Sequence, residues 1–208
     1  MRIVLAAILV FSNILAFGHD YENLKYSITI DALAGINRMK LNMKIERNSE
    51  QVKIYYNKLV DVDPKYKENH EEMERLYKNM SNAKSKKQKE RALNKLKKYR
   101  AKYEIYKDDS IVLNPSENAE YLNLIDSIYK ADEKELLRDR RSGLNITLDG
   151  TSFNIKVLEK HKTIKDLYIH SPRDKSHPLI NKLICDTLDL YRTQNPNSFL
   201  NKDLTNGY

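Results

Sequence analysis

The chain has 208 residues, of which 40% are hydrophobic and 32% charged, so it can bury a core and is not disordered throughout. Only 5 Gly and 5 Pro are present, which excludes a collagen-like chain and argues against a turn-rich propeller. A single Cys excludes an intrachain disulfide framework and zinc sites built from several cysteines. Lys and Arg number 37 against 29 Asp and Glu, giving a net charge of +8.

Residues 1–18 have the pattern of a secretory signal peptide. Arg2 is followed by an unbroken apolar run at 3–11, and the segment ends in Ala16-Phe17-Gly18, which suits cleavage before His19. An uncleaved membrane anchor is the alternative, although polar residues interrupt the run before it reaches the length of a membrane span. We therefore expect a secreted or periplasmic protein whose mature part has no membrane span.

The first part of the mature chain alternates apolar and polar residues. The alternation covers residues 26–30, 39–45 and 52–62, with turn-forming residues between these segments. This period of two predicts a three-strand antiparallel meander with one buried face.

A central segment, residues 64–141, is expected to be helical and to form an insertion. Apolar residues recur at helical spacing, and Ser81-Asn82 interrupts them, which predicts either a helical hairpin or one long helix. A further helix is expected to open at Asn114-Pro115-Ser116-Glu117 and to stop at Gly143.

The last part predicts a second meander and a final helix. Residues 144–148, 153–157 and 164–169 alternate again, and Asp149-Gly150 is a hairpin turn signal. A strongly amphipathic helix then begins near Pro178. The predicted fold is thus α+β: an antiparallel sheet of about six strands in two three-strand meanders, covered by a C-terminal amphipathic helix, with a long central helical segment.

The predicted domain organisation follows from these elements. Residues 19–194 form a single domain that carries the insertion 64–141, and residues 195–208 form a flexible polar tail.

The most unusual feature is a basic stretch from Lys84 to Lys102. It holds ten Lys and Arg against one acid, Glu90, and tyrosines are interleaved at Tyr99, Tyr103 and Tyr106. Such a face can be a solvated helix surface, a contact for an acidic protein, or a site for nucleic acid or another anionic polymer on which tyrosines stack. The predicted partner-binding residues are Lys86, Lys87, Lys89, Lys97, Lys98 and Arg100.

A second candidate is the polar loop 168–177. It contains His170, Asp174 and His177, which could serve a small hydrolase, although their spacing matches no catalytic or metal-binding motif.

Most aspartates near turns and helix starts are expected to be caps. These residues are Asp61, Asp63, Asp108, Asp109, Asp126 and Asp149. Cys185 lies in an apolar helical pattern and is expected to be a buried free thiol rather than a nucleophile.

The function expected from the sequence is that of an exported, non-enzymatic binding protein. An inhibitor or immunity-type protein for an acidic protein partner comes first, a binder of nucleic acid or acidic polysaccharide second, and a small hydrolase third. No cofactor or metal site is expected, since neither glycine-rich phosphate loops nor metal-ligand motifs occur.

Overall fold

The computed structural model describes residues 24–34, 40–68, 70–138, 150–196, 198–205 and 208. The expected signal peptide at 1–18 and the expected strand at 144–148 lie outside the described residues. The strands are β1 (Leu24–Ala34), β2 (Lys40–Asn48), β3 (Val52–Val62), β4 (Glu104–Leu113), β5 (Thr151–Glu159) and β6 (Lys162–His170). The helices are α2 (Lys65–Glu68), α3 (His70–Ser81), α4 (Lys86–Ala101), α5 (Ala119–Lys130), α6 (Glu133–Leu137) and α7 (Pro178–Gln194), with a 3-10 turn η1 at Lys202–Thr205.

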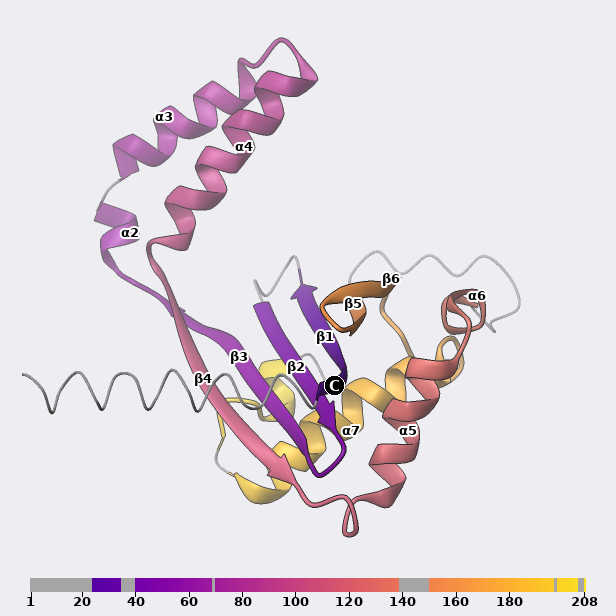
Figure 1. Cartoon of the computed structure of the whole chain (residues 1–208). Coiled ribbons are helices and arrows are strands. Elements are labelled where there is room, and N and C mark those ends of the chain that lie inside the picture. The colour runs from indigo at the N-terminus through magenta and orange to yellow at the C-terminus, as the bar shows by residue number, and fades with distance from the viewer. Residues whose placement is uncertain (1–23, 35–39, 69, 139–149, 197, 206–207) are drawn as a thin grey trace, which may run out of the picture. The chain divides into compact units, whose positions relative to one another are not determined.

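Six strands form one sheet in the order β4-β3-β2-β1-β5-β6 (Figure 1). β1 pairs antiparallel with both β2 and β5, so that Ile28 lies opposite Ile45 on one side and Val157 on the other. β5 pairs antiparallel with β6. The α+β class and the sheet of six strands are therefore confirmed. Their grouping differs from two meanders of three, because β1 to β4 neighbour one another in sequence order and β5-β6 add to β1.

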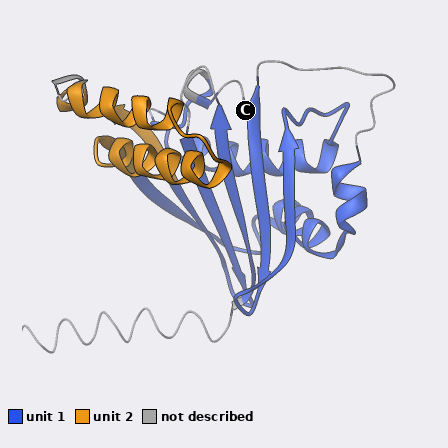
Figure 2. Cartoon of the chain, turned by 90° about the horizontal axis from the view of Figure 1, so that it is seen from above, with its two compact units in different colours: residues 1–56, 108–208 blue, residues 57–107 orange. Residues whose placement is uncertain are grey.

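The hydrophobic core of the sheet lies on one face, which α5 and α7 cover (Figures 1 and 2). In β1 every second residue from Tyr26 to Ala32 is buried, whereas Lys25, Asp31 and Leu33 are exposed. This alternation follows from the period of two in the sequence, because successive side chains of a strand point to opposite faces. The prediction that the C-terminal helix covers the sheet is confirmed.

Tyrosine hydroxyls join the sheet to these two helices. Tyr26 on β1 donates to Oδ1 of Asp126 on α5 at 2.5 Å, and Tyr56 on β3 donates to the Thr187 carbonyl on α7 at 2.7 Å. The Tyr121 hydroxyl on α5 lies 2.8 Å from Thr187 Oγ1, which links the helices to each other. Each ring buries apolar area while its hydroxyl keeps a partner, which explains why a core can use so many tyrosines.

The chain divides into two compact units, shown in blue and orange in Figure 2. Unit 1 comprises residues 1–56 and 108–208, and unit 2 comprises 57–107. The inserted unit is therefore shorter than the expected insertion 64–141, because α5 and α6 belong to unit 1.

β4 is the element that the sequence pattern assigned wrongly, since residues 104–113 were expected to be helical. Seven residues at its start are half-buried or exposed, and only Ile111 and Leu113 are buried, so the strand period is visible only at its end. Tyr103 and Tyr106 continue the spacing of the preceding helix by chance. Pairing with β3 overrides this local pattern, as tertiary context often does for edge strands.

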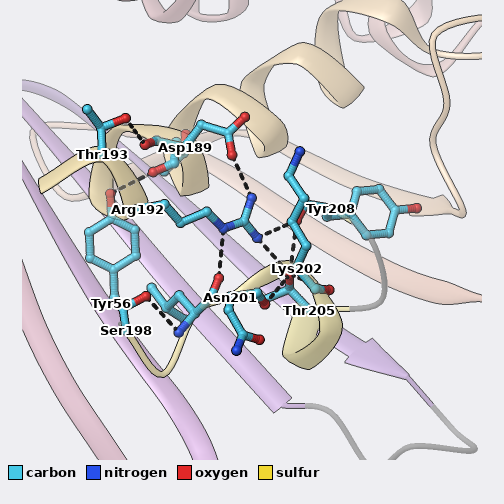
Figure 3. A network of polar contacts seen from close by, with 11 residues as sticks. Tyr56, Asp189, Arg192, Thr193, Ser198, Asn201, Lys202, Thr205 and Tyr208 are labelled. Carbon is cyan, nitrogen blue, oxygen red and sulfur yellow. Dashed lines mark hydrogen bonds and ion pairs between the residues drawn. The ribbon is translucent and has the colours of Figure 1, made fainter. Parts of the chain in front are cut away.

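Residues 195–208 differ from the expected flexible tail. Leu200 and Tyr208 are buried in the core, at 0% and 3% exposure. The Arg192 guanidinium on α7 donates to the Leu200 carbonyl at 2.7 Å, to Thr205 Oγ1 at 2.7 Å and to the Tyr208 carbonyl (Figure 3). The described part of this segment therefore belongs to the fold of unit 1.

None of the helices in the described part of the chain is long and apolar enough to cross a bilayer.

Candidate binding surface

Unit 2 contains a helical hairpin made of α3 and α4. The chain leaves α3 after Ser81 and enters α4 through a capping box, in which Gln88 N donates to Ser85 Oγ and Gln88 Oε1 accepts from Ser85 N, each at 3.2 Å. This box satisfies backbone N–H groups that have no partner inside the helix and fixes where α4 begins. Of the two arrangements that the sequence left open, the hairpin is confirmed and the single long helix is wrong.

Packing inside unit 2 fixes which side of α4 is turned inward. Leu76 on α3 and Leu96 on α4 are the buried apolar residues of the hairpin, at 7% and 4% exposure. At the base of the hairpin the Asp63 N–H donates to the Tyr103 carbonyl at 2.8 Å. The buried side of α4 is thus narrow, and most of its circumference faces solvent.

All of the net charge of the protein lies in unit 2. Residues 57–107 contain 16 Lys and Arg against 8 Asp and Glu, whereas the other residues contain 21 of each. Unit 1 is neutral by this count, and its charges often pair, as Lys44 does with Glu46 at 2.5 Å. The excess of +8 is therefore a local property of the hairpin unit.

The six predicted binding residues all lie on α4. Lys86, Lys87, Lys89, Lys97 and Lys98 are exposed, and Arg100 is half-buried. In the part of the chain that the structure describes, none of these six side chains forms an ion pair. The prediction that they share an exposed helix face is consistent with these positions, while a role in binding stays a prediction.

The basic side chains cover a wide arc of the helix. At 3.6 residues per turn, Ala92, Leu96 and Tyr99 fall within about 60° of one another, and the Lys and Arg of α4 occupy about 240° of the remainder. The only acid in this arc is Glu90. An anion can therefore approach α4 from several directions.

The first turn of α4 breaks a common rule of helix composition. It contains no acid, and Lys86, Lys87 and Lys89 stand close to the positive end of the helix dipole. Each such cation costs about 0.3–1 kcal/mol relative to a favourable charge there. Their presence concentrates positive potential at the N-terminal end of α4.

Two of the tyrosines that are interleaved with basic residues in the sequence also contact one another and a tyrosine of α2, and Lys102 Nζ lies 5.9 Å from the centroid of the Tyr99 ring. Tyr99 and Tyr103 pack with Tyr66 of α2, with ring centroids 5.3–6.5 Å apart. Tyr106 lies on β4, where its hydroxyl donates to Glu104 at 2.8 Å. Sequence spacing suggested a stacking platform, but these rings form a structural cluster and a strand contact.

The loop residues proposed for a hydrolase have separate partners. His170 Nδ1 lies 3.0 Å from Ser152 Oγ at the end of β6. Asp174, expected to orient an imidazole, instead accepts from Asn181 Nδ2 at 2.7 Å. His177 is the buried N-cap residue of α7, and its Nδ1 has no hydrogen-bond partner within the described residues. Among these three described residues, the structure therefore does not pair Asp174 with either histidine.

The aspartates divide into caps and tyrosine partners. Asp61 and Asp63 accept backbone N–H groups at 2.7 and 2.9 Å, as expected of turn residues. Asp109 accepts the Tyr191 hydroxyl in addition to the Ser110 N–H, and Asp126 accepts that of Tyr26. Burial, together with the carboxylate of Asp109, raises the pKa of Tyr191 to about 12. Asp149 lies outside the described residues.

A shallow groove of about 370 Å³ lies between α5 and α7. Its polar wall is partly neutralised internally, because Lys182 Nζ lies 2.8 Å from Asp186 and 3.2 Å from Glu120. The carboxylate of Asp186 is the main reason that the pKa of Lys182 is raised. Its lining includes Glu117, Glu120, Asp186 and Asp189 against Lys182 alone, so the groove is acidic and does not suit an anionic ligand.

Cys185 is a half-buried free thiol on α7, and burial raises its pKa, which favours the unreactive protonated form. Within the described residues no group of three or more His, Cys, Asp and Glu side chains is placed to hold a metal ion. Neither a protein-family model, nor a curated protein, nor a solved structure matches this chain, so the basic face of α4 must be interpreted from its own chemistry.

Proposed function

We propose that this chain is an exported, non-enzymatic binding protein that holds a linear anionic polymer on the basic face of α4. The observation that carries the proposal is the location of the whole net charge of +8 in unit 2, with eight exposed or half-buried cations on one helix. Export rests on the signal-peptide pattern of residues 1–18.

The placement of the charge supports binding rather than solubility alone. A solvated face gains nothing from three lysines in the first turn of a helix, where acids would stabilise it. Residues that break a local rule without a structural gain often belong to functional surfaces.

The composition of the face favours a polymer over a folded protein. Protein interfaces usually have a core of aromatic and apolar residues and contain few lysines, whereas this face consists mainly of Lys. One flat protein surface cannot contact an arc of about 240° around a helix. A flexible charged chain needs no apolar anchor and follows such an arc.

An acidic polysaccharide fits better than a single-stranded nucleic acid. Binding of single strands usually combines basic groups with aromatic rings on which bases stack. Here Tyr99 and Tyr103 are engaged with Tyr66 instead.

An acidic protein partner, bound in the manner of an inhibitor or immunity protein, is the second candidate. It is favoured by Leu93 and Tyr77, which are 37% and 40% exposed on the hairpin and would be covered by a protein surface. Stoichiometric capture of one acidic protein from native extract, with retention at salt that releases polysaccharide, would favour this candidate.

A non-enzymatic role is favoured by the described loop 168–177, where His170 contacts Ser152 and Asp174 accepts from Asn181, so neither is paired with His177. Substitution of His170 and His177 by Ala should leave polymer binding unchanged.

The proposal is tested by fluorescence anisotropy with labelled heparin across a salt series. The full chain should show a log–log salt slope of about −3 to −5, if roughly 0.7–0.9 counterions are released per contact over four to six contacts. A slope near zero, or no binding at low salt, would exclude charge-driven polymer binding.

A further inference from the structure

The basic face of α4 contains the same short pattern twice. Lys86-Lys87-Gln88-Lys89 is followed eleven residues later by Lys97-Lys98-Tyr99-Arg100, so each basic residue of the first set has a counterpart in the second. We call the basic residues of these sets the first triplet (Lys86, Lys87 and Lys89) and the second triplet (Lys97, Lys98 and Arg100).

Eleven residues make slightly more than three complete helical turns. The two triplets are therefore about 16 Å apart along the helix axis and rotated by only about 20° from each other. They face the same side of α4. Each triplet spreads over about 160° of the helix circumference. Arg91 and Lys95 lie at one edge of the basic arc, centred about 145° from the mean direction of the triplets, and Lys84 precedes the helix.

Both triplets lie on a single uninterrupted helix. α4 runs from Lys86 to Ala101 without a break, which fixes their separation. Neither triplet is neutralised by an ion pair within the described residues, and five of the six side chains are exposed. The spacing is thus set by the backbone, while the long side chains adjust to the ligand.

From this arrangement we infer that α4 presents two equivalent anion subsites that bind one acidic polysaccharide chain along the helix, each triplet holding one cluster of sulfate or carboxylate groups. The inference rests on the proposed function and adds to it a minimum ligand length and a register. Charge complementarity identifies the occupant, because an extended polysaccharide repeats its anionic groups along its length without needing an apolar contact.

Two linked subsites predict a length threshold in binding. A ligand too short to reach both triplets should bind the wild-type chain only a few-fold more tightly than a chain with one triplet. A ligand that spans about 16 Å should gain at least about tenfold from the second contact, since linked sites commonly gain far more. The gain should disappear when either triplet is removed.

The experiment measures the affinity of size-defined heparin oligosaccharides for four forms of the full chain by calorimetry or anisotropy. These forms are the wild type, K86Q/K87Q/K89Q, K97Q/K98Q/R100Q and the matched control K84Q/R91Q/K95Q. The control removes three exposed cations from the same region, so it reports the effect of net charge alone. Circular dichroism of each form verifies that α4 is retained.

We expect a step in affinity with oligosaccharide length in the wild type and the control, and no step in either triplet variant. A smooth rise with length in all four forms would overturn the two-subsite inference while leaving charge-driven binding intact. Binding of an acidic protein or of single-stranded DNA, with no binding of any oligosaccharide, would also overturn the inference. If no anionic polymer bound the wild-type chain in a salt-dependent manner, the proposed function itself would be refuted.

Discussion

Substitution of Arg192 by Ala should release the segment 198–208 from the core of unit 1. The guanidinium makes three contacts with this segment, to the Leu200 carbonyl, Thr205 Oγ1 and the Tyr208 carbonyl, and its side chain is only 13% exposed (Figure 3). Among the described residues outside this segment, no other side chain forms as many hydrogen bonds with it.

The magnitude follows from the contacts and from the burial that they maintain. Hydrogen bonds from a charged donor contribute about 1.5–3 kcal/mol each, but they are not additive here, because the segment detaches once they are lost. Detachment exposes Leu200 and Tyr208, each of which contributes about 1.5–3 kcal/mol of burial. The released residues regain conformational entropy, which offsets part of these losses, so we expect R192A to lower the free energy of unfolding by about 2–4 kcal/mol.

Urea unfolding combined with hydrogen exchange measures this effect. The backbone amides of residues 198–205 should lose protection in R192A before unit 1 unfolds. In the double variant with Y208A the loss should be clearly less than the sum of the single losses. D189N is the matched control, because it removes only the ion pair to a carboxylate that is 51% exposed and should cost less than about 1 kcal/mol. A change below about 0.5 kcal/mol in R192A, with unchanged exchange in this segment, would refute the reasoning.

Three further predictions concern other parts of the chain. Burial lowers the pKa of Lys58 from 10.5 to about 8. Between these two pH values the folded chain binds fewer protons than the unfolded chain, so stability increases with pH. The free energy of unfolding should therefore rise by about 2 kcal/mol from pH 8 to 10. K58M should abolish that rise in urea titrations at each pH. A Cβ at Gly150 would lie 1.7 Å from Ser171 Oγ, so G150A should lower the free energy of unfolding by about 2–4 kcal/mol. S171G removes this hydroxyl and suits the φ of 49° at residue 171, so it should recover part of that loss. Full additivity of the two changes in thermal unfolding would contradict this prediction. S85A removes the cap of α4 and should cost about 1 kcal/mol, with faster amide exchange in the first turn, whereas S116A outside any helix should leave that exchange unaltered.

The sequence pattern predicts those elements that have one face in the core and the other in solvent. β1, β2, β3 and β5 alternate between the core and solvent, and α7 has a continuous apolar stripe, so each carries its period in its own residues. β4 does not, because most of its residues are exposed on both faces and its conformation depends on pairing with β3. The residues of β4 alone therefore do not indicate that it pairs with β3.

The segment 195–208 shows a second limit of sequence patterns. It is polar and has no helical or strand period, so it resembles a tail. What orders it is one arginine on another element and two isolated apolar residues, Leu200 and Tyr208. Contacts of this kind are specific to the tertiary structure and leave no periodic signal.

The binding surface was predictable in part. A run of cations with few acids directly indicates an exposed basic helix, and α4 has the expected position and exposure. The roles of Tyr99 and Tyr103 were not predictable, because their packing depends on Tyr66 of α2, which is far from them in the sequence. The neutrality of unit 1 emerges only once the limits of unit 2, residues 57 and 107, are known.

The central claim is that the charge on α4, and not the net charge of the protein, creates the binding site. The most direct measurement compares heparin affinity at one fixed ionic strength between two variants with the same net charge. One replaces the six cations of the two triplets by Gln, and the other replaces six exposed lysines of unit 1, which are Lys25, Lys130, Lys134, Lys160, Lys162 and Lys175. We predict that the α4 variant binds at least about 100-fold more weakly than wild type and the unit 1 variant within about threefold, since only the former loses contacts to the polymer. Equal losses in the two variants would show that binding follows overall charge and would contradict the account.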